Sequence, residues 1–189
     1  MDAIDNLHQR ASIPAKNLVE PGPSEEHLDI ILRAAVTAPD HKAMRPWRFI
    51  VVRGSARQQL GDIYAEAATL REPGISEADI ERQRSKPMRS PLLIVVAAKI
   101  TPGNPKVPEV EQLLSAGAAA EHIQLAAHAL GYGSVWVTGA NAFDDHIKGA
   151  LRLETGDAIV GFIHIGTANI PPPAVNRPDP QRFVEYWQP

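Results

Sequence analysis

Apolar residues recur at helical spacing in three main parts of the chain. The first follows Ser24, a residue type that caps helix N-termini well, and it stops before Pro39. The second follows Ser55, which we expect to cap that helix in the same way. The third lies between Ser115 and Gly131, a glycine placed where a helix usually ends. Two shorter helices are predicted, one ending near Ser12 and one at residues 144–153.

Continuous apolar runs between these helices are typical of buried strands. They lie at residues 47–52 (WRFIVV), 91–98 (PLLIVVAA) and 158–166 (AIVGFIHIG), with a shorter strand ending in Trp136-Val137-Thr138-Gly139. The chain is therefore expected to be α+β, with helices around a sheet of about four strands and no regular βαβ repeat. Because no linker or internal repeat interrupts the pattern, we expect residues 1–189 to form a single domain.

Two segments depart from this regular pattern. Residues 71–89 are highly charged and are interpreted as a mobile excursion over the surface, with a short helix after Ser76. The last 24 residues, from Gly166, carry six of the 17 prolines of the chain. They also carry Phe183, Tyr186 and Trp187, which need cover from solvent. We expect residues 166–189 to be an arm that lies across a partner subunit.

The third helix has an unusual run of small side chains. Residues 116–120 read AGAAA, so another helix or a flat ligand can approach this backbone closely. Such a helix belongs at the centre of something larger than one subunit. We therefore expect a homodimer.

Composition narrows the classes of function. Charged residues make up 22% of the chain and the formal net charge is −3, without a basic stripe, so neither nucleic acid nor a membrane surface is an expected partner. The absence of cysteine excludes disulfides, thiolate catalysis and thiolate metal sites. The first residues lack the apolar core of a signal peptide, and a cytoplasmic protein is the expectation. The seven histidines are scattered without metal-ligand spacing, so no metal site is expected.

Several local features have both a functional and a structural interpretation. Arg10 and Ser12 suit a phosphate, but they also suit an exposed helix end and a turn. His41 lies in a polar loop where it is either a ligand contact or an ordinary loop residue. Trp136 lies in a segment that either presents a flat side chain and backbone donors to a ligand or is a core strand. Arg177 either reaches a phosphate or is solvated.

The order and spacing of these pieces resemble the nitroreductase family of FMN-dependent NAD(P)H oxidoreductases, most closely its small bacterial YdjA-like branch. The resemblance spans essentially the whole chain. The residues that carry it are the R-x-S at 10–12, LRAAVTAPDHKAMRPWRFIVV at 32–52, KVPEVEQLLSAGAAAEHIQLAAHALGYGSVWVTGA at 106–140, VGFIHIGT at 160–167 and NRPDPQRFV at 176–184. The resemblance implies a nitroreductase-like fold with a mixed or antiparallel central sheet flanked by helices.

The resemblance also implies a cofactor site. Arg10 and Ser12, with Ala11 between them, map onto residues that bind the FMN phosphate. The loop from Thr37 to His41 maps onto a loop that reaches the flavin from the second subunit. Trp136, Val137 and Thr138 map onto the strand along the isoalloxazine ring. Family dimers form through the central helices and exchange their C-terminal arms.

The implied reaction is a ping-pong transfer in which NADH or NADPH delivers hydride to the flavin N5 and an oxidised acceptor then takes the electrons. The acceptor is a nitroaromatic or another small molecule, with enone, quinone or aldehyde reduction as alternatives. No protein acid, base or nucleophile is required, which fits a chain without a catalytic constellation. A flavin-binding protein without turnover and a flavin-free dimeric scaffold remain the alternatives of other classes.

The chain departs from the family pattern at several positions. Ala11 stands where a second basic residue is usual, and Thr37 replaces an arginine common in this branch. The phosphate is therefore expected to meet fewer positive charges. Lys16, Lys42 and Arg177 are the candidates to compensate.

Overall fold

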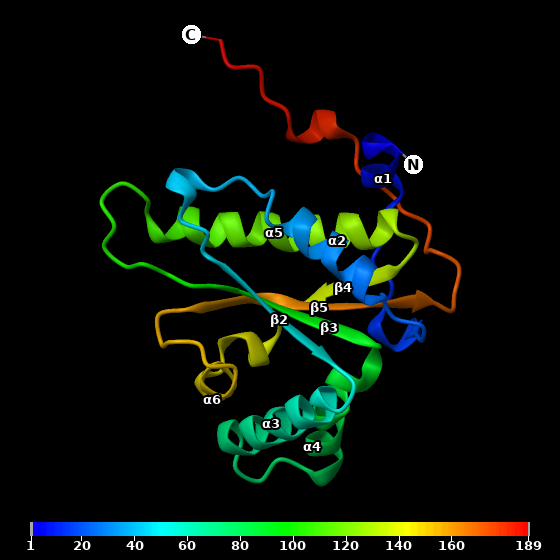
Figure 1. The fold of residues 1–189 in the computed structure, drawn as a ribbon, viewed down its shortest axis with the longest axis vertical. Coiled ribbons are helices and arrows are strands. Elements are labelled where there is room, and N and C mark those ends of the chain that lie inside the picture. The colour runs from blue at the N-terminus through cyan, green and yellow to red at the C-terminus, as the bar shows by residue number, and fades with distance from the viewer. Residues whose placement is uncertain (1, 189) are drawn as a thin grey trace.

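The computed structural model describes residues 2–188, in which six α-helices surround a five-stranded sheet (Figure 1). The helices are α1 (Ala3–Gln9), α2 (Glu25–Ala35), α3 (Ala56–Arg71), α4 (Glu77–Arg84), α5 (Glu109–Ala129) and α6 (Asp145–Ala150). The strands are β1 (Leu18–Val19), β2 (Trp47–Arg53), β3 (Leu92–Ala98), β4 (Gly133–Val137) and β5 (Ala158–Ala168). The predicted α+β class is confirmed.

The sheet is antiparallel throughout, in the order β1-β5-β3-β2, and β4 also pairs with β5. The sheet has one strand more than the sequence predicts. The additional strand is β1, in which only Leu18 and Val19 pair with the end of β5, and two residues are too few to show the alternation of a strand. The pairing of Leu93 with His164 and of Trp136 with Ile163 fixes the register around the central strands.

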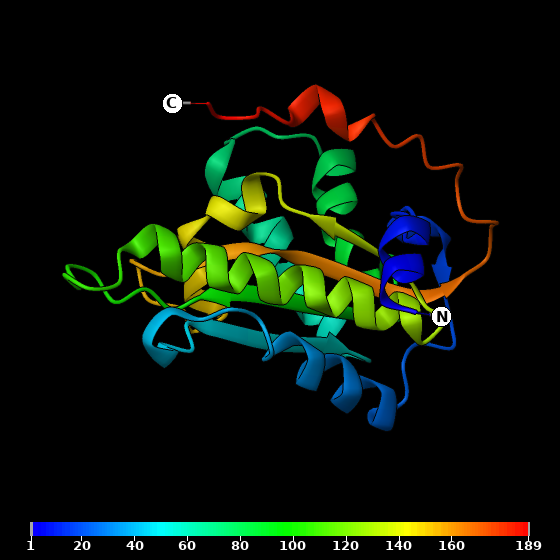
Figure 2. The same ribbon diagram turned by 90° about the horizontal axis from the view of Figure 1, so that it is seen from above.

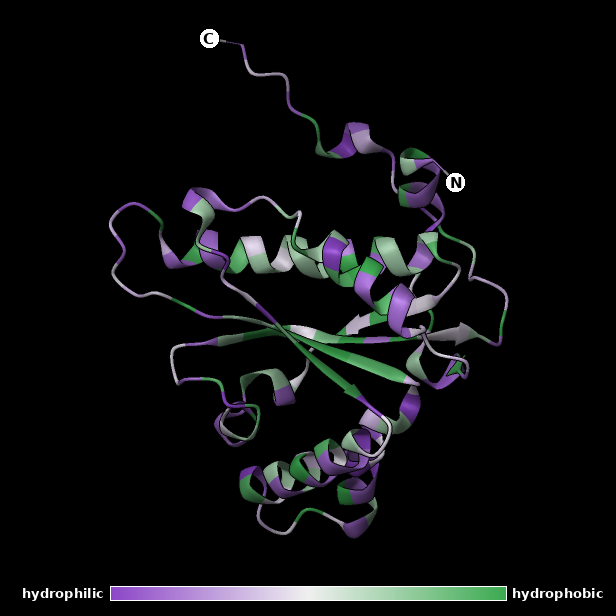
Figure 3. Ribbon diagram, viewed as in Figure 1, coloured by the Kyte–Doolittle hydropathy of each residue, from purple (hydrophilic) through white to green (hydrophobic). Residues whose placement is uncertain are grey.

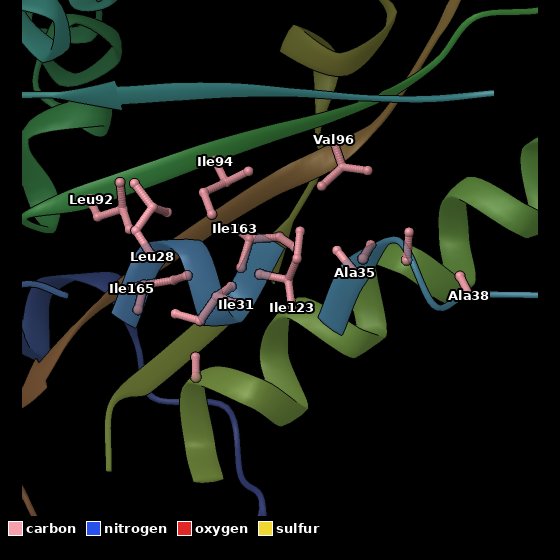
Figure 4. Packing of buried hydrophobic residues seen from close by; sticks show 13 residues of the cluster. Leu28, Ile31, Ala35, Ala38, Leu92, Ile94, Val96, Ile123, Ile163 and Ile165 are labelled. Carbon is pink, nitrogen blue, oxygen red and sulfur yellow. The ribbon is translucent and has the colours of Figure 1, made fainter. Parts of the chain in front are cut away.

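The sheet is covered on both faces, and β3 supplies side chains to each. Leu92, Ile94 and Val96 point to the cluster under α2 and α5, which we call the α2–α5 face. Leu93 and Val95 point to the cluster under α3 and α6, the α3–α6 face. Figure 4 shows the first cluster from close by, and Figure 3 shows that β2 and β3 are hydrophobic along most of their length. All of β3 is buried, as the apolar run predicts.

The helix ends follow the sequence signals in one case and not in another. Ser24 caps α2, because its Oγ accepts a hydrogen bond from the backbone N–H of His27 at 3.1 Å. Ser55 was expected to cap α3, but its side chain makes no cap hydrogen bond and its backbone is already helical. The helix α5 begins at Glu109, directly after the turn-rich residues 101–108, with Pro108 at its N-cap position and the small-residue run inside it.

The charged segment at residues 71–89 is packed rather than a free excursion. It forms α4 and a 3-10 turn at Lys86–Arg89, and both lie against α3. Gly61 of α3 lets the Arg84 carbonyl approach so closely that a Cβ at this position would collide with it. Arg84 is also paired with Asp62 of α3. The charged side chains therefore help attach this segment to the domain. The prediction of a mobile excursion was wrong because it assumed that these side chains only contact solvent.

The C-terminal segment leaves the sheet after β5, passes α1 and then extends outward (Figure 1). β5 continues to Ala168, and beyond it every residue from Asn169 to Gln188 is exposed. The exposed fractions of Phe183, Tyr186 and Trp187 are 75%, 78% and 85%. Among the helices of the described chain, none combines the length and the apolar character that crossing a membrane requires.

Candidate functional site

The Arg10–Ser12 segment is fixed to the beginning of β4. The chain leaves α1 at Arg10, and Ser12 then forms an isolated parallel bridge with Ser134. The N–H of Ile13 donates to the Ser134 carbonyl at 2.9 Å. Arg10, Ala11 and Ser12 therefore have a defined place on the sheet edge.

The Arg10 side chain turns inward. Only 17% of it is exposed, and its Nε lies 3.5 Å from Glu121 Oε1 on α5. Its Nη1 is buried and has no hydrogen-bond partner within residues 2–188. An exposed, solvated arginine is therefore not what the structure shows. A buried guanidinium N–H without an acceptor is costly, and an anionic oxygen would satisfy it.

A second arginine meets the first. Arg177, in the C-terminal segment, donates from Nη2 to the Arg10 carbonyl at 2.7 Å. Of the three residues considered as compensating cations, Arg177 is thus the one that the structure brings to Arg10. Lys16 and Lys42 are exposed. His128 also lies nearby, and burial together with the Arg10 charge lowers its pKa, so it adds no positive charge at neutral pH.

The far end of β4 carries the other half of the predicted cofactor contacts. The Trp136 indole packs over Gly161 of β5, where any Cβ would collide with the ring, and its Nε1–H donates to the Val160 carbonyl at 3.2 Å. The indole also packs against the apolar cluster of the α2–α5 face. Val137 and Thr138 continue past it to the edge of a cavity. Of the three residues Trp136, Val137 and Thr138, only the last two line this cavity.

This cavity has a volume of about 250 Å³ and lies on the α3–α6 face of the sheet. Its walls come from five parts of the chain that are distant in sequence. Besides Val137 and Thr138 they are Ala15, Tyr64, Lys86, Arg89, Gly139, Asn141, Phe162 and His164. Sequence reasoning missed Tyr64, Lys86, Arg89 and His164 as site residues, because Tyr64 and His164 fit core patterns and the two cations lie in the charged segment.

The loop from Thr37 to His41 runs along α5, with Thr37 Oγ1 3.2 Å from His122 Nδ1 and His41 near the start of the helix. His41 Nδ1 is 2.6 Å from Glu111 Oε2 near the start of α5, whereas Arg10 is paired with Glu121 ten residues later. At 1.5 Å per residue the two carboxylates are about 15 Å apart along the helix. Thr37 Oγ1 donates to the Ala34 carbonyl at 2.8 Å. Figure 2 shows this loop under one end of α5 and α1 at the other end.

The backbone of this loop is strained. Lys42, Ala43 and Arg45 have φ angles of 59°, 53° and 49°, in the left-handed region that residues with a Cβ seldom adopt. Asp40 Oδ2 holds the turn by accepting from the Arg45 N–H at 2.7 Å. Conformations of this kind cluster at binding sites and at contacts between molecules. Across residues 2–188, His, Asp and Glu form no group of three or more suited to a metal ion.

Known proteins resemble this chain over most or all of its length. A profile of the nitroreductase family matches residues 7–167. YdjA of Escherichia coli (strain K12), provisionally named an NAD(P)H nitroreductase, is 40% identical over 188 residues, which cover 99% of this chain and 100% of YdjA. A nitroreductase-like family protein from Bacillus cereus has a TM-score of 0.85 at 22% identity, covering 100% of this chain and 97% of that one.

A second solved structure adds a cofactor to the comparison. An FMN-dependent nitroreductase from Clostridium difficile R20291 has a TM-score of 0.70 at 28% identity, covering 97% of this chain and 98% of that one. The nitroreductase-like fold expected from the sequence is confirmed by these neighbours. Because the family profile and YdjA both match nearly the whole chain in sequence, this chain belongs to the nitroreductase family of oxidoreductases.

Proposed function

We propose that this protein is an FMN-dependent NAD(P)H oxidoreductase that reduces a nitroaromatic or another small oxidised acceptor. The observation that carries the proposal is the buried Nη1 of Arg10, a charged donor without a partner in residues 2–188. Two residues after Arg10, Ser12 is bridged to the beginning of β4, and Arg177 donates to the Arg10 carbonyl. Phosphate is the ligand that this donor set suits best.

The two ends of β4 fit the two ends of FMN. From Ser134, which is bridged to Ser12, to Thr138 is four residues, or about 13 Å of extended strand. A phosphate at Arg10 and Ser12 and a flat ring along Val137 and Thr138 suit a cofactor in which a five-carbon chain joins the two groups. Ala11 adds no side-chain contact, so Arg10 carries most of the phosphate recognition.

When bound, FMN supplies the hydride acceptor and donor chemistry, and NADH or NADPH is the source of electrons. The protein residues then bind and orient. Arg10 and Ser12 fix the phosphate, and the Val137–Thr138 backbone fixes the edge of the ring. This division of labour requires no catalytic acid or base from the chain.

We further propose a homodimer in which Thr37–His41 of one subunit reaches the site of the other. Within one chain His41 lies about 15 Å along α5 from the glutamate that pairs with Arg10, so His41 is available to another site. The outer face of α5 exposes Val110 and Leu114 at 59% and 66%, and the aromatic C-terminal residues are also uncovered. A second copy would cover these surfaces.

Arg10→Ala tests the cofactor site. The substitution removes a charge-assisted contact worth roughly 1.5–3 kcal/mol, so FMN affinity should fall about ten- to 150-fold in a fluorescence titration. Riboflavin, which lacks the phosphate, should bind wild type and variant almost equally. Arg33→Ala is the matched control, because Arg33 is exposed and pairs only with Asp29. Equal FMN affinity of wild type and Arg10→Ala would contradict the proposed phosphate site.

Subunit mixing tests the shared site. Arg10→Ala and His41→Ala homodimers should each show little NAD(P)H oxidation, and their mixture should regain part of it because a heterodimer contains one intact site. Exchange is verified by mass spectrometry of differently tagged subunits. If verified heterodimers stay inactive, the two residues do not act across the interface. Anaerobic bleaching of bound flavin by NAD(P)H separates the proposed enzyme from a flavin-binding protein without turnover.

A further inference from the structure

Tyr64 is the most deeply buried aromatic donor in the walls of the cavity beside Thr138. It comes from α3, is only 4% exposed and lines the cavity together with Phe162 of β5. The two rings are in edge-to-face contact, with centroids 5.7 Å apart, and both belong to the apolar cluster of the α3–α6 face. Packing therefore fixes the position from which the Tyr64 hydroxyl acts.

The Tyr64 hydroxyl is one of three buried side-chain polar atoms that have no hydrogen-bond partner within residues 2–188. The others are Arg10 Nη1, which we assign to the phosphate, and Gln83 Oε1, whose residue is outside the cavity walls. Burial raises the pKa of Tyr64, so the hydroxyl keeps its proton and is available as a donor. Buried donors without an acceptor are costly and rare in folded proteins. The missing partner is therefore an acceptor.

The other polar side chains of the walls do not supply this acceptor. Within the described chain the walls contain no carboxylate, and Lys86 and Arg89 have donors only. Asn141 Oδ1 already accepts from Arg71 Nη2 at 3.0 Å. The protein thus presents a fixed donor to the cavity without an acceptor to match it.

His164, in the same walls, does not satisfy the Tyr64 hydroxyl either. The single Ser90 hydroxyl proton goes to the Leu92 carbonyl at 2.9 Å, so the 2.8 Å contact between Ser90 Oγ and His164 Nδ1 requires the imidazole N–H as donor. Burial and the Arg89 charge lower the pKa of His164 to about 4, so the ring is neutral. Its remaining nitrogen forms no hydrogen bond with Tyr64 in residues 2–188.

A flavin ring carries acceptors in one half only. The pyrimidine half has two carbonyl oxygens and ring nitrogens, whereas the dimethylbenzene half is hydrocarbon. A buried donor in the cavity wall is satisfied only by the pyrimidine half. Reduction of the ring adds negative charge to this half, and a hydrogen bond to a charged acceptor is stronger than one to a neutral acceptor.

We propose that the Tyr64 hydroxyl donates a hydrogen bond to the pyrimidine half of the flavin ring. This contact holds that half of the ring in the cavity and raises the reduction potential of the bound flavin. The proposal rests on the proposed function, which makes the flavin ring the occupant of the cavity. Arg10 and Tyr64 then recognise different parts of FMN, the first the phosphate and the second the ring.

Tyr64→Phe tests the contact because it removes only the hydroxyl. The affinities for FMN and for riboflavin should both fall about three- to tenfold in fluorescence titrations, as expected for one neutral hydrogen bond. Arg10→Ala, in contrast, should weaken FMN alone. Without flavin, Tyr64→Phe should be at least as stable to urea as wild type, because the substitution removes an unpaired buried hydroxyl.

Tyr132→Phe is the matched control. The Tyr132 hydroxyl has a partner, His27 Nδ1 at 2.9 Å, so the same chemical change should lower the stability and leave both flavin affinities unchanged. The midpoint potential of the bound flavin should become more negative in Tyr64→Phe by about 15–30 mV, which is a three- to tenfold effect for a two-electron couple. Tyr132→Phe should keep the wild-type potential.

The flavin titrations separate failure of this contact from failure of the proposed function. If wild type binds flavin but Tyr64→Phe keeps the wild-type riboflavin affinity and potential, the ring contact is wrong and the FMN site stands. If wild type binds neither FMN nor riboflavin, the proposed function is wrong and the ring contact is overturned with it.

Discussion

The two faces of the sheet are built differently although they share the strand β3. On the α2–α5 face Ile31, Ile94, Ile123 and Ile163 have no exposed surface and belong to one apolar cluster. The α3–α6 face has its own apolar cluster, but Tyr64 within it has an unpaired hydroxyl, and His164 lies at the wall of the cavity. The α2–α5 cluster is thus closed apolar packing, whereas the α3–α6 cluster borders a cavity and contains a hydroxyl without a partner.

The two sides of the sheet therefore contribute differently to stability and to binding. Close apolar packing makes the fold rigid, whereas an unsatisfied donor next to a cavity lowers stability until a bound ligand forms a hydrogen bond with it. The frame on the α2–α5 face also holds α5, whose length separates the His41 loop from Arg10. We therefore expect substitutions on the two faces to differ in the property that they damage.

The largest effect is expected from Ile31→Ala on the α2–α5 face. Removing this side chain leaves a cavity in closed packing, and the free energy of unfolding should fall by about 2–5 kcal/mol in urea titrations. The neighbouring Ile30→Ala is the matched control, since Ile30 is 41% exposed on the same helix and should change stability far less. Similar losses in both variants would mean that the buried cluster is not the frame of the domain.

A smaller, pH-dependent effect is expected from His164 on the α3–α6 face. Its pKa is about 4 in the folded protein against 6.5 in the unfolded chain, so the unfolded state binds more protons in this window. The contribution is fully present above about pH 6.5 and is lost as the pH falls toward 4. At 1.36 kcal/mol per unit, the loss reaches about 2–3 kcal/mol by pH 4.5.

His164→Asn isolates this contribution. Between pH 7 and 4.5 the variant should lose about 2–3 kcal/mol less stability than wild type, because its side chain does not titrate there. His8→Asn, at an exposed position on α1, serves as the control and should keep the wild-type pH dependence. If His164→Asn shows the wild-type pH dependence, the imidazole is not held neutral by its surroundings and the two faces are electrostatically alike.

The sequence predicts those parts of the fold whose signals are local. The β3 run, the Ser24 cap and the strand at residues 47–52 are all readable from neighbouring residues, and the structure confirms them. The two-residue strand β1 could not be predicted because its pairing with β5 depends on residues about 150 positions later. The attachment of α4 could not be predicted because it depends on the contact between Gly61 and Arg84.

The candidate site divides in the same way. The Arg10–Ser12 contacts and the Val137–Thr138 contacts were predicted as short motifs, and their role in binding FMN stays a prediction. The cavity was not predicted, because Tyr64, Lys86 and His164 meet only through the register of β3 with β5 and the packing of α3. Each residue has an ordinary local explanation, and only their assembly in three dimensions shows a site.

The contact between Trp136 and Gly161 has a consequence for how this sequence can vary over evolution. Because no side chain fits at residue 161 while the indole lies over it, substitutions at residues 136 and 161 depend on each other. A larger residue at 161 becomes acceptable only in a lineage where residue 136 has already become small. Such a lineage would also lose the hydrogen bond to Val160 and expose β5 beside the proposed flavin strand. The pair thus limits the order in which substitutions at this edge of the sheet can accumulate.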